Sequence, residues 1–360
     1  MKKIKLFDPF FDKKEENAIK RVLNSHFWAS GAGVGQVAKF EKRFNEFIGS
    51  KRCVAVNSGT AALHLALSVI DIKNKEVIVP SISFVSTAHA VMYNGGKPVF
   101  VDIDPKTLCL DPNKIKKSIT KKTKVILPVH FGGMPCNLTE IKSICKEHDL
   151  FLIEDAAHAA GSSYKNKKIG THGTAVCFSF HPVKNLAMPS GGAITLNDSK
   201  SGFYEKILKS LRWCGIVDRK GTKYDVANLG WNYYMNEFSA AIGLEQLKKL
   251  DAMNSIRRKI AKRYSNEILL HKKMPFNQEC SYHLFWIRLK NRIKFMKNLT
   301  RNNIETGIHY YPIHQMKFYK SRLTLKNTEA ISNELVSLPI HPNLSDSDVT
   351  KIIKLVNRFA

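Results

Sequence analysis

The sequence contains no apolar run long enough to cross a membrane. None of its apolar stretches approaches the roughly 20 residues that a spanning helix needs. Its charged start, MKKIKLFDPFFDKKEE, also lacks the apolar centre and the small-residue cleavage site of a signal peptide. Both absences argue against a membrane-spanning or exported protein, so we expect a cytoplasmic protein without a membrane partner.

Cysteine pairs at the spacing of a disulfide framework or a metal site are missing too. The seven cysteines are an odd number and form no C-x-x-C pair, which is typical of a protein from a reducing compartment. Cys53 and Cys177 lie in strand-like runs, where we expect them to be core residues. His309, His314 and His341 have no carboxylate or cysteine partners at ligand spacing, so we predict no metal site.

Acidic residues are scarce relative to basic ones. Thirty Asp and Glu stand against 57 Lys and Arg, which leaves a formal charge of +27. Such a charge attracts nucleic acid, an anionic membrane surface or a phosphorylated substrate. The basic residues are scattered singly and in pairs, with no long basic block, no zinc-finger spacing and no aromatic RNA-binding signature. We therefore predict a lysine-rich solvated surface that attracts a diphosphate-bearing substrate, and no nucleic-acid partner.

Internal repeats and low-complexity segments are absent; instead, strand-like runs alternate with helical segments. The strand-like runs are CVAV, EVIVP, PVFVDID, KVILPVHF, LFLIED, AVCFSF and AITLN. Continuous apolar strands that alternate with helices predict an α/β protein, whose central sheet is mostly parallel and covered on both faces.

Helical patterns flank this region on both sides. An amphipathic helix near residues 13–23 precedes a second helix that carries Phe40, Phe44 and Phe47 on one face. The loop FWASGAGVGQV between them fits either a close approach to a ligand or a simple turn. One long helix from Glu237 leads to a shorter α+β pattern. We therefore predict a large domain over residues 1–250, with a helical N-terminal segment, and a small C-terminal α+β domain over residues 251–360.

Functional residues gather where the predicted strands end. Five of them fall at or just after a carboxyl end, where ligands bind in α/β sheets: Ser58, Thr60, Phe84, Asp155 and Ser179. The turn NSGT at positions 57–60 leads into an Ala/Leu-rich helix, and free amides at a helix start favour a phosphate. Ser58 and Thr60 are also ordinary helix caps, so the turn alone fits capping as well as phosphate binding.

An acid and a lysine lie close together in residues 151–194. Asp155 ends the run FLIED, and Lys184 follows the run AVCFSF. Pyridoxal phosphate needs such a pair: a lysine amine that holds it as a Schiff base, and a carboxylate that keeps its pyridine nitrogen protonated. Alone, Asp155 fits a helix cap and Lys184 a surface lysine. Together with the phosphate-type turn, they predict a pyridoxal phosphate enzyme with Lys184 and Asp155 as catalytic residues.

Six segments in order along the chain carry a family resemblance: NSGTAAL, EDAAHA, FSFHPVKN, GWNYYMNEFSAAIGLEQL, GIHYYPIH and VSLPIHPNLSD. They resemble the sugar aminotransferases of the DegT/StrS type, which share the fold of aspartate aminotransferase, and the resemblance runs nearly end to end. It implies fold type I of the pyridoxal-phosphate-dependent transferases and a homodimer with shared active sites. It also implies transfer of an amino group from L-glutamate to a nucleotide-linked keto sugar, for amino-sugar or surface-glycan biosynthesis.

The resemblance gives a role to each matching residue. Lys184 corresponds to the Schiff-base lysine and Asp155 to the partner of the ring nitrogen. Phe84 corresponds to an aromatic residue that stacks on the ring, and His158 to a residue near the ring hydroxyl. The remaining cofactor-binding positions are those of the phosphate site: Gly59, Thr60, Ser179 and, from the neighbouring subunit, Asn232.

Two positions depart from the pattern of many relatives. Tyr234 stands where many members carry arginine, which leaves the partner of the donor's carboxylate open, and Ser190 replaces a glutamate before the glycine pair. We expect altered substrate handling and an unaltered reaction class. One alternative is a sugar dehydratase on the same cofactor, against which Lys184 argues because related dehydratases carry histidine there. The other is a non-catalytic regulatory or binding protein of the same fold.

Overall fold

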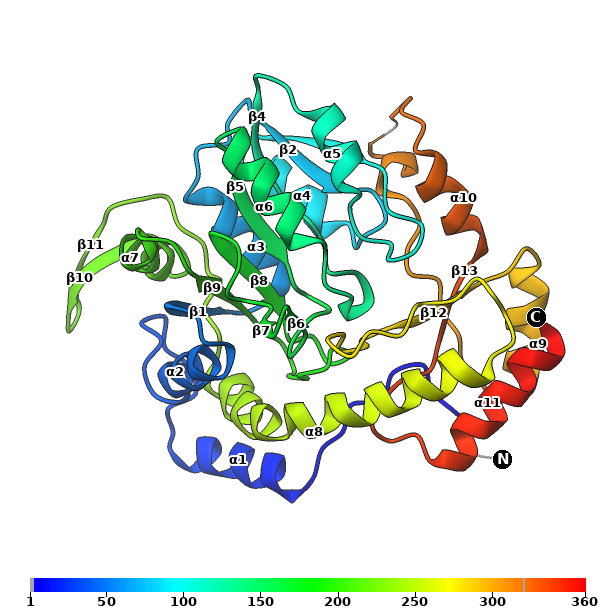
Figure 1. Ribbon diagram of the computed structural model, residues 1–360. Helices are drawn as coiled ribbons and strands as arrows, with labels where there is room; N and C mark the ends of the chain where they lie inside the picture. The colour runs from blue at the N-terminus through cyan, green and yellow to red at the C-terminus, as the bar shows by residue number, and fades with distance from the viewer. Residues whose placement is uncertain (1–2, 320) are drawn as a thin grey trace.

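The computed structural model describes residues 3–319 and 321–360. Its centre is a seven-stranded sheet with the spatial order β1-β9-β8-β5-β4-β2-β3 (Figure 1). The strands are β1 (Arg52–Val56), β2 (Glu76–Pro80), β3 (Lys97–Val101), β4 (Thr123–Ile126), β5 (Phe151–Asp155), β8 (Ala175–Ser179) and β9 (Gly192–Leu196). The strands from β8 to β3 run parallel, whereas β9 is antiparallel to both β1 and β8. The prediction of a mostly parallel α/β sheet is confirmed.

Helices cover both faces of this sheet, because successive side chains of a strand point to opposite sides. Along β5, Leu152 belongs to one buried cluster and Ile153 to the other. One face packs against α2 (Gln36–Ile48), α5 (Pro112–Ser118), α6 (Leu138–Glu147) and part of α8 (Glu237–Glu267). The opposite face packs against α3 (Gly59–Ser68), α4 (Ser86–Tyr93) and α7 (Ser201–Leu211). Burial on both faces is why the strands read as continuous apolar runs.

Capping residues set the starts of three other helices. α1 (Lys13–Asn24) begins with a capping box of Asp12 and Glu15, and α11 (Asp346–Phe359) begins with one of Ser345 and Asp348. At the start of α8, the side chain of Asn236 accepts a hydrogen bond from the backbone of Ser239. These caps satisfy amides that would otherwise lack partners, so the helices start where the sequence predicts.

The chain beyond α8 forms a smaller α+β arrangement. β12 (Phe285–Arg288) pairs antiparallel with β13 (Leu335–Leu338), accompanied by α9 (Arg292–Arg301), α10 (Lys326–Glu334) and α11. The N-terminal segment reaches this part, where Ile4 pairs with Ile304. Figure 1 shows α8 running from the neighbourhood of α2 to that of α11. Because α8 continues through residue 250, the boundary at 250/251 falls inside one helix, and the domain division stays a prediction.

A hairpin that we did not predict from the sequence lies between α7 and α8. β10 (Ile216–Lys220) pairs antiparallel with β11 (Lys223–Val226), and Gly221 in the turn has φ 61°. Figure 1 shows this hairpin projecting beside α7. Its strands are short and almost fully exposed, so the sequence carries only a weak strand signal there. The remaining short elements are the strands β6 (Ser163–Tyr164) and β7 (Lys167–Lys168) and the 3-10 turns η1 (Phe131–Gly133) and η2 (Ile313–Gln315).

Candidate active site

The carboxyl ends of β1, β5 and β8 meet at one edge of the sheet. Val56 at the end of β1 and Ser179 at the end of β8 both pair with Gly192 of β9, and Asp155 at the end of β5 pairs with Cys177. A cavity of about 370 Å³ lies at this edge. Seven of the eight predicted site residues line it: Gly59, Thr60, Phe84, Asp155, His158, Ser179 and Lys184. The sheet therefore brings together residues that are far apart in the sequence.

Asp155 is a buried carboxylate with two fixed donors. Only 4% of the residue is exposed. The hydroxyl of Thr87 donates to Oδ2 at 2.8 Å, and the backbone N–H of Ala157 donates to Oδ1 at 3.1 Å. Burial raises the pKa of Asp155, while the two hydrogen bonds and the nearby charge of Lys184 act in the opposite direction. A cationic N–H group in the cavity would offset the cost of burying this charge.

Lys184 reaches the same cavity from the turn after β8. Its backbone N–H donates to the carbonyl of His181 at 2.8 Å, and its Nζ lies 3.4 Å from Nε2 of His283. Burial lowers the pKa of Lys184 to about 8, against the opposing effect of the Asp155 charge. At neutral pH this amine is therefore free base far more often than an ordinary lysine, and the free base is the nucleophilic form.

The turn between β1 and α3 forms a cradle for an anion. Oγ of Ser58 accepts a hydrogen bond from the backbone of Ala61 at 3.1 Å, which confirms the capping interpretation for Ser58. The N–H groups of Gly59 and Thr60 lie in the first turn, where a helix offers them no partner and its dipole is positive. A Cβ on Gly59 would lie 2.7 Å from Cβ of Ser179, so the glycine keeps the cradle open. These residues fit the phosphate of pyridoxal phosphate.

Phe84, His158 and Tyr310 complete the wall of the cavity. Phe84 is 57% exposed, and its ring centroid lies 6.2 Å from that of Tyr310. Nδ1 of His158 accepts the backbone N–H of Gly132 at 3.2 Å, so a neutral His158 carries its proton on Nε2, which is 3.2 Å from the Tyr310 hydroxyl. Burial lowers the pKa of His158 well below its usual range, which keeps it neutral. Tyr310 then accepts from His158, and its own proton is free to face the cavity.

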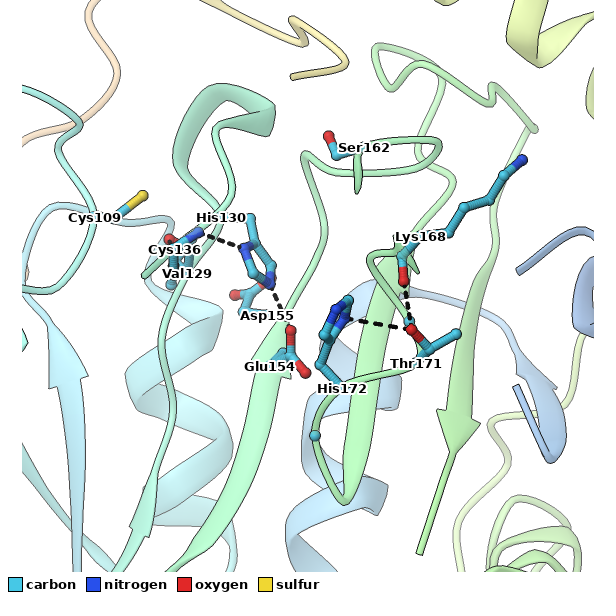
Figure 2. Close-up of polar contacts among 12 residues, drawn as sticks. Cys109, Val129, His130, Cys136, Glu154, Asp155, Ser162, Lys168, Thr171 and His172 are labelled. Carbon is cyan, nitrogen blue, oxygen red and sulfur yellow. Dashed lines mark hydrogen bonds and ion pairs between the residues drawn. The ribbon is translucent and has the colours of Figure 1, made fainter. Parts of the chain in front are cut away.

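A buried pair on the other side of β5 supports this wall. Nε2 of His130 lies 2.8 Å from Oε2 of Glu154, and the backbone N–H of Cys136 donates to Nδ1 of His130 at 3.1 Å. Figure 2 draws both contacts. Because the backbone N–H of Cys136 donates to Nδ1, the nitrogen of His130 that donates to the glutamate is Nε2. The pair holds the loop that follows β4, and this loop presents the Gly132 N–H to His158.

Asn232 is the predicted site residue that does not line the cavity of its own chain. Its side chain is exposed, its backbone pairs with Trp213, and its carbonyl accepts from the side chain of Asn57 at 3.3 Å. Of the two positions that depart from the family pattern, Ser190 lines the cavity and Tyr234 does not.

The structure separates the three histidines that invite a metal interpretation. His309 lines the cavity, whereas His314 is buried between Ser81, at 2.6 Å, and Glu329, at 3.1 Å. His341 lies 3.0 Å from the carbonyl of Lys5. Over residues 3–319 and 321–360, no group of three or more His, Cys, Asp or Glu side chains is arranged to hold a metal ion. Nor does any helix in these ranges combine the length and apolar composition of a membrane span.

Three residues at the site were not predicted as site residues. Thr87 lies one helical turn after Phe84, so its position near the cavity could have been inferred from spacing. Tyr310 lies in the segment GIHYYPIH, which was noted only as part of the resemblance. No sequence pattern near His283 indicates that it contacts the site, because 99 positions separate it from Lys184.

The edge of this mostly parallel sheet combines a buried carboxylate, a lysine amine and an anion-binding helix start. This combination is typical of a pyridoxal-phosphate-dependent enzyme of fold type I. The sequence profile of the DegT/DnrJ/EryC1/StrS aminotransferase family matches residues 9–357. The chain therefore belongs to this family and is a pyridoxal-phosphate-dependent sugar aminotransferase.

Similar proteins match along nearly the whole chain. The spore coat polysaccharide biosynthesis protein SpsC of Bacillus subtilis is 35% identical over 371 residues, which cover 97% of this chain and 95% of SpsC. The structure of Helicobacter pylori PseC, an aminotransferase involved in the biosynthesis of pseudoaminic acid, has a TM-score of 0.93 at 29% identity and covers 99% of both chains. DesV of S. venezuelae has a TM-score of 0.89 at 30% identity, over 96% of this chain and 94% of DesV.

Proposed function

We propose that this enzyme transfers the amino group of L-glutamate to a keto sugar that is linked to a nucleotide. The observation that carries the proposal is the shared cavity of Lys184 and Asp155, which lies beside an anion cradle. The formal charge of +27 favours a substrate that carries a diphosphate. SpsC and PseC act in polysaccharide and pseudoaminic acid biosynthesis, which supports a sugar pathway for this enzyme.

Each residue of the cavity has its own role in the proposed reaction. When bound, pyridoxal phosphate supplies an electron sink for the carbanion at the donor's Cα. Lys184 would hold the cofactor and, as a free amine, would remove the proton from the donor's Cα and return it to the cofactor carbon. Asp155 would keep the ring nitrogen protonated, because a buried carboxylate stabilises a facing N–H cation. Phe84 would cover the ring, and Gly59, Thr60 and Ser179 would hold the phosphate.

We also propose a homodimer in which Asn232 completes the partner's site. Asn232 is exposed and does not line the cavity of its own chain, although its carbonyl contacts Asn57 at the cavity's edge; this supports a role across an interface. Large apolar side chains nearby in the sequence are exposed too: Tyr224 at 56% and Leu229 at 87%. A cytoplasmic location fits this function and stays a prediction.

The test uses purified enzyme with its cofactor, L-glutamate and a panel of nucleotide-linked keto sugars. We expect glutamate alone to shift the near-visible absorbance band and to release 2-oxoglutarate, and one sugar of the panel then to gain an amino group by mass spectrometry. Loss of water from the sugar without consumption of glutamate would identify a dehydratase. Bound cofactor with no response to any amino donor or sugar would identify a binding protein.

A further inference from the structure

The imidazole of His283 contacts the amine of Lys184 without lining the cavity. Its Nε2 lies 3.4 Å from Nζ, and 1% of the residue is exposed. Within the described ranges, the side chain of Lys184 makes no other hydrogen bond. His283 thus belongs to the layer of residues behind the cavity wall, where it can act on a ligand only through Lys184.

Packing fixes the direction of this imidazole. Phe7 of the N-terminal segment stacks on it with a centroid separation of 5.4 Å and an interplanar angle of 16°, and His158 lies 4.4 Å away. The backbone N–H of Leu284 donates to the carbonyl of Gly132 at 3.3 Å. Nδ1 is buried and has no hydrogen-bond partner in the described part of the chain. Ring contacts, together with the fixed backbone, therefore aim Nε2 at Lys184.

Burial keeps His283 neutral, and the neighbouring basic groups act in the same direction. The groups that act on it are Lys184, His158, Arg257 and His309, each of which opposes a further positive charge. Burial, and then these groups, lower the pKa of His283 well below its usual range. Burial likewise lowers the pKa of His309 to about 4. A neutral imidazole has one ring nitrogen with a lone pair, and an ammonium group has only donors.

We propose that His283 is a positioning residue for Lys184, whose amine donates a hydrogen bond to Nε2 and is held in the cavity by it. The proposal rests on the proposed role of Lys184 as the residue that holds the cofactor. The hydrogen bond to His283 would have two effects on Lys184. The acceptor stabilises the ammonium form against the effect of burial, and it restricts the rotamers of a long side chain.

Three variants separate this role from simple packing. His283→Phe keeps a planar ring against Phe7 and removes the lone pair. His283→Gln loses the ring and places an amide oxygen, again an acceptor, near the position of Nε2. Phe7→Leu weakens the stack and leaves the imidazole in place. Circular dichroism and thermal unfolding of the cofactor-free proteins establish that each variant is folded.

The experiment measures how fast the cofactor-free protein captures pyridoxal phosphate at a series of pH values, by the growth of the near-visible band. For the unaltered enzyme, we expect the rate to rise with pH around a midpoint near 8, since the free amine reacts. In His283→Phe, the midpoint should fall by about 0.5–1 pH unit, because the ammonium form loses its acceptor. The plateau at high pH should fall roughly fivefold, because the amine is less well oriented.

The other two variants distinguish a hydrogen-bonding role of His283 from packing alone. His283→Gln should restore the midpoint, and Phe7→Leu should keep it while lowering the plateau. A midpoint that stays unchanged or rises in folded His283→Phe would overturn the proposal. If His283→Phe does not fold, His283→Leu takes its place as the variant without an acceptor. The proposal would then be overturned by a midpoint that shifts in His283→Gln and does not shift in His283→Leu. Capture with an unaltered band in Lys184→Ala would instead refute the role of Lys184 itself, so the two failures are distinguishable.

Discussion

The hydroxyl of Thr87 donates a hydrogen bond of 2.8 Å to Oδ2 of Asp155. Thr87 lies in the first turns of α4, and its Oγ1 is also 2.8 Å from the hydroxyl of Ser83. α4 thereby orients the carboxylate at the end of β5. Because hydrogen bonds to a charged group contribute about 1.5–3 kcal/mol, this contact is large enough to affect the ionisation of Asp155.

Replacement of Thr87 by valine should slow the reaction. The valine keeps the shape and removes the donor, so the pKa of Asp155 should rise further and its hold on the ring nitrogen should weaken. We expect kcat to fall about tenfold, with the acid limb of the pH profile displaced to higher pH. Thr87→Ser, which keeps the hydroxyl, should retain most activity. An unchanged pH profile in Thr87→Val would show that the contact does not tune Asp155.

Asparagine at position 155 should stabilise the cofactor-free protein at neutral pH. The folded-state pKa of Asp155 is raised, so the stability that this group contributes is complete at low pH and is lost as pH rises through that pKa. Asp155→Asn escapes this loss at pH 7, and the melting temperature should rise by roughly 1 °C for each kcal/mol gained, because a chain of 360 residues has a large unfolding entropy.

Calorimetry over a range of pH checks the direction of this stability difference between Asp155→Asn and the wild type. The advantage of Asp155→Asn should shrink as pH falls, because the wild-type carboxyl becomes neutral. Added pyridoxal phosphate should stabilise the wild type more than the variant, since only the carboxylate pairs with a protonated ring nitrogen. An advantage that grows toward acid pH would contradict the assignment of the raised pKa.

Alanine in place of Lys184 should abolish transamination and remove the near-visible band of the enzyme with its cofactor. In the proposed mechanism this amine both holds the cofactor and moves the proton. No other lysine lines the cavity within the described part of the chain. Asp155→Ala should reduce turnover severely while leaving the band visible. The measurements are absorbance spectra and 2-oxoglutarate release; retained transamination in Lys184→Ala would refute the assignment.

A methyl group on Gly59 should weaken cofactor binding. Its Cβ would lie 2.7 Å from Cβ and 3.1 Å from Oγ of Ser179, a separation that forces one side of the cradle to move. We expect the dissociation constant for pyridoxal phosphate to rise at least about tenfold, or roughly 1.4 kcal/mol. Fluorescence titration of the cofactor-free protein measures this change.

Gly202 provides the matched control. It lies in α7, and a Cβ there would meet nothing within 4 Å. Gly202→Ala should leave cofactor affinity unchanged and should stabilise the helix slightly. Equal affinity in Gly59→Ala and Gly202→Ala would show that Gly59 does not border the phosphate.

Residues that depend on a local pattern could be predicted from the sequence. The apolar runs of the strands, the caps of α1, α3 and α11, and the positions of Asp155 and Lys184 at strand ends all follow from neighbours a few positions away. The hairpin β10–β11 was not predicted because its two strands are short and mostly exposed, so no buried face marks them in the sequence. The division into domains and the role of Asn232 depend on contacts that no local pattern encodes.

The sequence by itself determined the α/β class and the positions of the turn at residues 57–60, of Asp155 and of Lys184 at strand ends, because burial periodicity and chain reversals depend on neighbouring residues. Only the tertiary structure decided that Thr87 orients Asp155, that Gly132 sets the tautomer of His158, and that His283 contacts Lys184. These three contacts join separate elements of the fold. Which residues meet in these contacts depends on how helices and loops pack on the sheet, and that packing cannot be inferred from the spacing of residues in the sequence.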